Sequence, residues 1–137
     1  MRTNSDITIY NKFVDPATHS EAWIHNQVED VIWEDTKAAN VIASGLLEAD
    51  RYTVYIPMAR GENYHTPIAW QAMIDKGTSW TLQLGDVIVR GLVDDDISDT
   101  FTISDLKKKY DDVAVIRSVD RMAQGSLVLR HWQIGAN

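Results

Sequence analysis

The side chains that could do chemistry in this chain are few, and their spacing builds no local catalytic or metal-binding motif. Cysteine is absent from the 137 residues, which excludes disulfides, thiolate metal sites and a cysteine nucleophile. The histidines do not form the closely spaced pairs of zinc motifs, so a metal site would depend on folding to gather them. A metal-dependent hydrolase is therefore a remote alternative, with His25, His65 and His131 as its candidate ligands.

A run of carboxylates offers the second possibility for chemistry. Asp94, Asp95 and Asp96 stand together and Asp99 follows closely. A calcium loop of the EF-hand type needs ligands at alternate positions, a central glycine and a terminal glutamate, and this spacing is missing here. The run predicts a solvated acidic loop or, as the functional alternative, an acidic rim that meets a basic partner or repels DNA.

Sequence signatures of enzymes are also missing. The chain contains no GxSxG, GxxxxGK[ST] or GxGxxG pattern, and Gly85 and Gly91 are more simply read as turn and strand-end residues. We therefore predict a protein that is not an enzyme, with no catalytic residues, no resident metal and no cofactor.

Composition narrows the classes further. A net charge of −7 and a pI near 4.9 disfavour a general binder of phosphate backbones, which normally shows a basic face. No apolar stretch approaches the roughly 20 residues that cross a bilayer, and the N-terminus lacks the apolar core of a signal peptide. These features predict a cytoplasmic protein with no membrane association.

The elements that must position these residues are mostly short strands, predicted by alternation and by Trp, Ile and Val content. A helix over 23–33 is possible by length, but its composition favours a long strand. Polar loops are predicted over 60–66 and 94–100, a turn over 15–18, a connection over 37–50 and a hairpin loop over 120–125. The predicted strands cover 6–10, 23–33, 51–56, 80–82, 86–90, 113–119 and 126–134.

Two short helices complete the pattern. Thr66 as N-cap, with Pro67 at the first helical position, predicts a helix over 67–75 that Gly77 stops. Ser104 as N-cap predicts a second helix over 105–110. The fold class is therefore mainly β, a small β-barrel or sandwich with one or two short helices and extended loops. A single domain over residues 1–137 is the simplest organisation.

Six segments, in the same order over nearly the whole chain, resemble a family of small structural proteins encoded in phages and prophages of Gram-positive bacteria. These segments are ITIYNK (7–12), ANVIASGL (39–46), DRYTVYIP (50–57), WTLQLGDVIVRG (80–91), LKKKYDDV (106–113) and LRHWQIG (129–135).

The resemblance implies a head-completion or head-closure (stopper-like) protein of the head–tail connector in the phage neck. Such a protein forms a ring on assembly, retains packaged DNA, which passes through without specific binding, and offers a surface to the tail. Its partners are portal or adaptor proteins and tail proteins. Its location is the host cytoplasm during assembly and then the virion neck. A tail terminator or tail-completion ring, and a capsid accessory protein, remain alternatives within the same biology.

A different class, a small nucleic-acid-binding or ligand-binding β-barrel, also remains open, because tryptophans on a barrel can stack on bases. For the connector role, Lys107, Lys108 and Lys109 could pair with acidic loops of a neighbouring subunit, the alternative being a solvated helix face. The other interface candidates are Tyr64 and His65 in the 60–66 loop, and Asp94, Asp95, Asp96 and Asp99 in the 94–100 loop.

Overall fold

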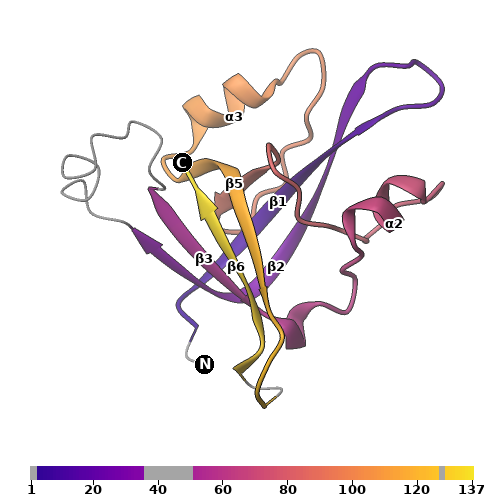
Figure 1. Ribbon diagram of the computed structural model, residues 1–137. Coiled ribbons are helices and arrows are strands. Elements are labelled where there is room, and N and C mark those ends of the chain that lie inside the picture. Colours follow the sequence, from indigo (N-terminus) through magenta and orange to yellow (C-terminus); the bar gives the residue numbers. More distant parts are fainter. Residues whose placement is uncertain (1–2, 36–50, 127–128) are drawn as a thin grey trace.

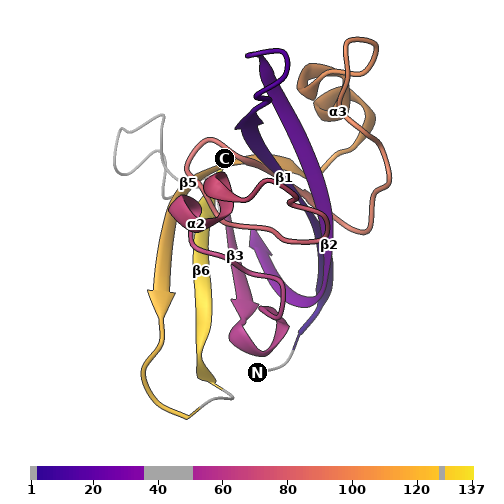
Figure 2. The ribbon, with the colours of Figure 1, turned by 90° about the vertical axis from the view of Figure 1, so that its right-hand side faces the viewer.

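The computed structural model describes residues 3–35, 51–126 and 129–137, and in these residues six antiparallel strands close into a barrel in the order β1-β2-β3-β6-β5-β4 (Figures 1 and 2). The predicted β fold is confirmed, and of the two predicted architectures the barrel is the one observed. The strands are β1 (Ser5–Val14), β2 (Glu21–Asp35), β3 (Tyr52–Pro57), β4 (Val87–Arg90), β5 (Val113–Met122) and β6 (His131–Ala136).

The barrel core follows from the strand pattern. On β3, Tyr52, Val54 and Ile56 alternate with half-buried neighbours and all point inward. Trp33, Trp80 and Trp132 join them inside the barrel. A second apolar cluster lies between the barrel and the helix α3 (Ile103–Lys109). It contains Tyr10, Val87, Val89, Val93 and Leu106.

The long strand predicted over 23–33 is confirmed within β2, and the turn over 15–18 connects it to β1. Three strands are longer than predicted: 23–33 extends to Glu21–Asp35, 6–10 extends to Ser5–Val14, and 113–119 extends through Met122 into the predicted hairpin loop. The last strand begins at His131 and ends at Ala136, so its predicted span of 126–134 was wrong at both ends. The connection predicted over 37–50 lies outside the described residues.

The predicted strand over 80–82 was wrong. Trp80 makes a single isolated bridge to Tyr64, and residues 81–82 join no ladder. Asn11 replaces the missing strand partner, because its side chain donates to the Thr81 carbonyl (2.8 Å) and accepts from the Thr81 amide (3.2 Å). The extended backbone of this segment is thus satisfied by a side chain.

Both predicted helices exist with shifted bounds. Helix α2 (Pro67–Ala72) begins at Pro67 as predicted but ends before the predicted limit of 75. Helix α3 begins two residues earlier than predicted and ends at Lys109. Thr102 is its N-cap, so the assignment of Ser104 to that position was wrong. Thr102 and Asp105 form a reciprocal capping box, which satisfies two backbone N–H groups at once.

In the described part of the chain, no helix is long and apolar enough to span a membrane.

Candidate interaction surfaces

Asp95 holds the acidic loop (residues 94–100) to the rest of the fold through three groups of the same chain, and we call these contacts the Asp95 fastening. Lys109 donates to its carboxylate at 2.9 Å, and the Tyr110 hydroxyl donates to the same group. The Tyr10 hydroxyl, from β1, donates to the Asp95 main-chain carbonyl at 2.6 Å. The loop is therefore tied both to the C-terminal end of α3 and to the barrel wall, and Asp95 is largely used within the chain.

Electrostatics at this fastening reflects the same contacts. The hydrogen bonds from Tyr110 and then Lys109 stabilise the ionised form, so the pKa of Asp95 lies below its usual value. The bond to Asp95 raises the pKa of Tyr110 and that of Lys109. Burial, and then the charge of Asp95, raises the pKa of Tyr10. At neutral pH the cluster therefore holds a carboxylate, an ammonium group and two neutral phenols.

The neighbouring carboxylates differ in their partners. Asp94 accepts a hydrogen bond from Gln27 at 3.0 Å, and Asp96 lies 3.2 Å from Nδ1 of His25. His25 in turn stacks on the Tyr10 ring at 5.2 Å between centroids. The side chain of Asp96 is 88% exposed, and Asp99 is exposed as well. Asp94 is exposed too, but it is hydrogen-bonded to Gln27, so a partner contact stays a prediction mainly for Asp96 and Asp99.

A cleft of about 610 Å³ opens beside this loop. Its walls carry Trp23, Ile97 and Ile103, and Glu21 and Asp99 lie on its lining. Lys12 already reaches Glu21 at 3.7 Å and lies over the Trp23 ring.

The three predicted lysines separate into two kinds. Lys109 pairs within its own chain through Asp95, whereas Lys107 and Lys108 are exposed on α3. Pairing with a neighbouring subunit therefore stays a prediction for Lys107 and Lys108. Of the three lysines, Lys109 is the one that the structure brings into contact with the acidic run.

The other pair of predicted residues has a structural position. Tyr64 is half-buried and packs on Trp132 (centroids 4.5 Å apart) and on Trp80 (5.4 Å), and burial raises its pKa. The His65 amide donates to the Trp80 carbonyl at 2.9 Å. The 60–66 loop, predicted to be exposed, therefore partly covers the barrel core.

The histidines proposed as remote metal ligands are not brought together. His25 pairs with Asp96, while His131 contacts Tyr55 edge-on and the Leu129 carbonyl. Within residues 3–35, 51–126 and 129–137, no group of three or more His, Asp or Glu side chains has a metal-binding arrangement.

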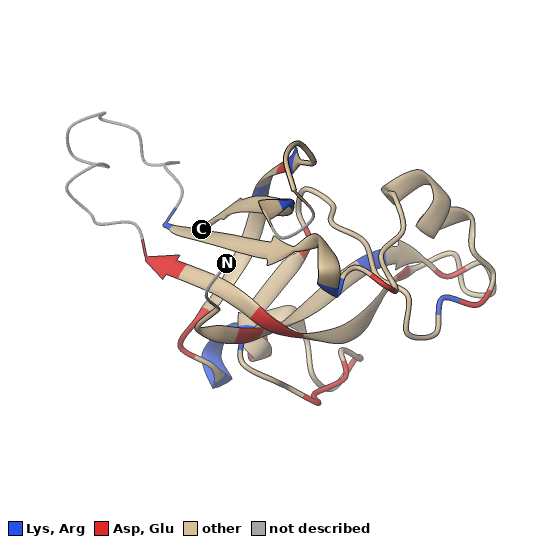
Figure 3. Ribbon diagram, turned by 90° about the horizontal axis from the view of Figure 1, so that it is seen from below, with Lys and Arg blue, Asp and Glu red and all other residues tan. Residues whose placement is uncertain are grey.

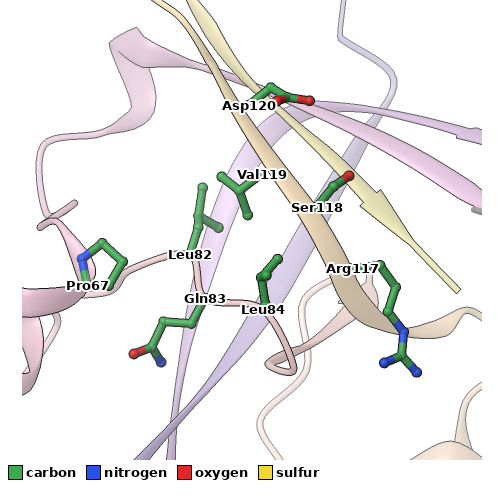
Figure 4. A pocket seen from close by; sticks show the side chains of 8 residues that line it. All are labelled: Pro67, Leu82, Gln83, Leu84, Arg117, Ser118, Val119 and Asp120. Atoms are coloured by element: carbon green, nitrogen blue, oxygen red, sulfur yellow. The ribbon is translucent and has the colours of Figure 1, made fainter.

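The most distinctive surface was not predicted from the sequence: a groove of about 560 Å³ along β5, which we call the seam groove (Figure 4). Leu82 and Val119 point toward each other across it, and Leu84 stands beside them with 68% of its surface exposed. The one sequence signal was an apolar side chain at Leu84 in a turn before Gly85. The groove is lined by Pro67, Leu82, Gln83, Leu84, Arg117, Ser118, Val119 and Asp120.

A buried carboxylate holds one wall of the seam groove in place. Asp86 is only 1% exposed and accepts hydrogen bonds from Gln83 Nε2 (2.7 Å), Asn11 Nδ2 (2.8 Å) and the Lys12 amide (3.2 Å). Burial raises its pKa, and the three donors oppose that rise. Gln71, from α2, donates to Gln83 at 2.8 Å and extends the same network. The backbone around Leu84 is therefore anchored to β1 and α2.

A family model matches residues 2–137, and its description reads "Family of unknown function (DUF6751)". The chain belongs to this family. No curated protein and no solved structure matches the chain.

Proposed function

We propose that the protein is a non-enzymatic structural component of a phage neck, of the head-completion or head-closure type. In this role it assembles as a ring at the head–tail connector, retains packaged DNA and offers an attachment surface to the tail. Portal or adaptor proteins and tail proteins are its partners. The resemblance of the six sequence segments supports this biology.

The packed interior of the barrel is the observation that supports an assembly role over ligand binding inside the barrel. The interior holds tightly packed side chains, with Trp33, Trp80 and Trp132 all 5% exposed or less. Buried Asp86 is surrounded by donors from its own chain, so it is occupied in holding the fold. The features left for function are on the outside, which favours an assembly module over a barrel that holds a ligand inside.

The acidic face supports passage of DNA without binding. Asp96 and Asp99 are exposed, and neither has a Lys or Arg partner among the ion pairs of the described residues. Exposed carboxylates repel phosphates over about 8 Å at physiological salt. If this face lines the channel, DNA slides past it without adhering.

A nucleic-acid-binding barrel is the alternative from another class. Binding of a phosphate backbone needs a continuous basic surface. Figure 3 instead shows Lys and Arg scattered among Asp and Glu segments. The charge pattern therefore supports the connector role more than this alternative. A tail-terminator ring shares the same features and is separated from a closure protein by experiment.

The test is electron microscopy of phage particles produced without this protein. A head-closure protein predicts heads that fill and then leak, lying apart from finished tails. Intact heads with tails of irregular length would indicate a tail terminator instead. Normal infectious particles would overturn the neck role, and salt-sensitive affinity for DNA in the purified chain would then favour the nucleic-acid binder.

Complementation with point variants makes the test specific for the acidic face. The double variant Asp96→Asn and Asp99→Asn removes exposed charge without touching the Asp95 fastening, so particles should assemble but release DNA more slowly. The matched control is Asp75→Asn with Asp111→Asn, which removes the same charge at two exposed carboxylates outside the acidic loop. Equal ejection rates for wild type and the Asp96 and Asp99 double variant would refute a channel-facing position of this loop.

A further inference from the structure

One stretch of the barrel wall lacks a neighbouring strand on one side. β4 pairs with β5 only through Val113–Val115, and the last bonds across this side join Ile116 to Asp86 (2.8 Å) and to Gly85 (2.9 Å). β5 continues to Met122, and within the described residues its continuation pairs only with β6. Figure 2 shows this half of β5 at the outer border of the barrel wall.

An unpaired strand edge specifies the backbone conformation of whatever covers it. Its N–H and C=O groups lie in a row with the spacing of a β-ladder, so an extended segment satisfies them best. On β5 this row runs from Arg117 to Met122. Nothing in the described chain lies in ladder register with it on that side.

The seam groove adds an apolar receptor beside the edge. Leu82 and Val119 form its floor, and Leu84, which is 68% exposed, forms a side wall. An exposed leucine beside an open groove loses its contact with water when an apolar side chain enters, at about 25 cal/mol per Å². The Asp86 network holds the wall in place, so binding would not first have to order it.

The free edges of β5 in two copies of this chain do not complement each other. Antiparallel pairing around a two-fold axis requires that one residue lies opposite itself. Centring on Val119 places Arg117 opposite Arg121 of the second copy, and centring on Asp120 or Arg121 places like charges directly opposite. Like charges in that position are destabilising. Centring on Ser118 avoids repulsion but forms no ion pair, so a segment of different sequence fits better.

We propose that the free edge of β5 accepts an extended segment of another protein as an added antiparallel strand. An apolar side chain of that segment sits between Leu82, Leu84 and Val119. Its charges complement the groove ends, with an acidic residue opposite Arg117 and a basic residue opposite Asp120. Arg117 can take part, because only its Nε is used, on Asn137 at 2.8 Å.

The probe is a synthetic peptide, acetyl-Val-Ser-Lys-Val-Thr-Glu-amide, which places Val, Ser, Lys, Val, Thr and Glu opposite residues 122 to 117 and stops short of Ile116, whose backbone is already bonded to Asp86 and Gly85. It is titrated to about 1 mM into the full-length ¹⁵N-labelled protein, and amide shifts and hydrogen exchange are followed. The expected result is saturable shifts over residues 117–122 and 82–84, with slowed exchange on β5. The peptide with Lys and Glu interchanged has the same composition and should bind about fivefold more weakly.

Paired variants of the protein give the second arm. Leu84→Asp should weaken binding at least tenfold, whereas Leu92→Asp, at a 45% exposed leucine outside the groove, should leave it unchanged. Well-dispersed spectra of both variants establish that they fold. Absence of saturable binding, or binding that survives Leu84→Asp, would overturn the proposal.

A dimer that forms with rising concentration and is lost in Leu84→Asp would instead identify a second copy as the occupant, and would equally overturn it. The inference concerns the isolated chain, so its failure is distinguishable from failure of the neck role, which particles test.

Discussion

Removal of the Asp86 carboxylate should destabilise the barrel and deform the seam groove. In Asp86→Ala three donors lose their acceptor: Asn11 Nδ2, Gln83 Nε2 and the Lys12 amide. Each hydrogen bond to a charged group stabilises the fold by about 1.5–3 kcal/mol. The variant also avoids the penalty of burying a charge, and this gain of several kcal/mol offsets part of the lost hydrogen-bond energy. The net loss should be about 2–4 kcal/mol, which lowers the Tm by about 10 °C for a chain of this length.

Asp86→Asn separates the charge from the hydrogen bonds. Its amide oxygen can replace the carboxylate oxygen that accepts from Asn11 and Gln83, but its NH₂ group then faces the Lys12 amide. One unsatisfied donor costs about 1–3 kcal/mol, and relief from burying a charge acts in the opposite direction. The variant should therefore lie within about 1 kcal/mol of wild type at neutral pH.

The pH dependence has a defined sign. Burial raises the folded-state pKa of Asp86 above its ordinary value of 3.8, so the folded state binds this proton more tightly than the unfolded state. The contribution of Asp86 is then greatest below 3.8 and declines as pH rises through the folded pKa. Wild type should gain stability relative to Asp86→Asn as pH falls through this window.

Urea unfolding followed by tryptophan fluorescence, at a series of pH values, measures these differences. Asp111→Asn, at an exposed carboxylate, is the matched control and should change stability by less than about 0.5 kcal/mol. The reasoning would be refuted if Asp86→Ala fell within that same small range. It would also be refuted if the difference between wild type and Asp86→Asn were independent of pH.

Two further predictions concern the ends of the barrel. Gly61→Ala places a Cβ 2.5 Å from Cη2 of Trp132, so overpacking should lower the free energy of unfolding by about 1–3 kcal/mol. The same urea assay measures this loss, and an unchanged stability would show that the Trp132 side chain can move aside without cost. Asp95→Asn should loosen the acidic loop, which hydrogen exchange at residues 94–97 reports. Because the folded pKa of Asp95 is lowered, its stabilisation is present above 3.8 and is lost as pH falls through the folded value, so wild type should approach the variant in acid.

Alternation of apolar and polar residues predicted a strand well where one face of that strand is buried. Alternation in Tyr52, Val54 and Ile56 placed β3, because one face of that strand is buried. The start of α3 was misplaced although a local signal was present. Thr102 and Asp105 have the spacing of a capping box, which satisfies more backbone groups than Ser104 could alone.

The remaining features depend on contacts that sequence does not reveal. Tyr10 reaches the Asp95 carbonyl across 85 positions of the chain, so the acidic run could not be recognised as a fastened loop. The Asn11 side chain bonds the Thr81 backbone across 70 positions of the chain, so the predicted strand over 80–82 needs no strand partner and joins no ladder. The seam groove exists because β4 is shorter than β5 and lies beside it, a consequence of strand order that only the fold supplies.

The most direct test of the proposed neck role is cryo-electron microscopy of phage particles recovered from cells that express this chain. The account predicts ring density between head and tail into which the six-stranded barrel fits, with the protein detected in the same particles by mass spectrometry. Purified infectious virions that lack the chain would contradict the account.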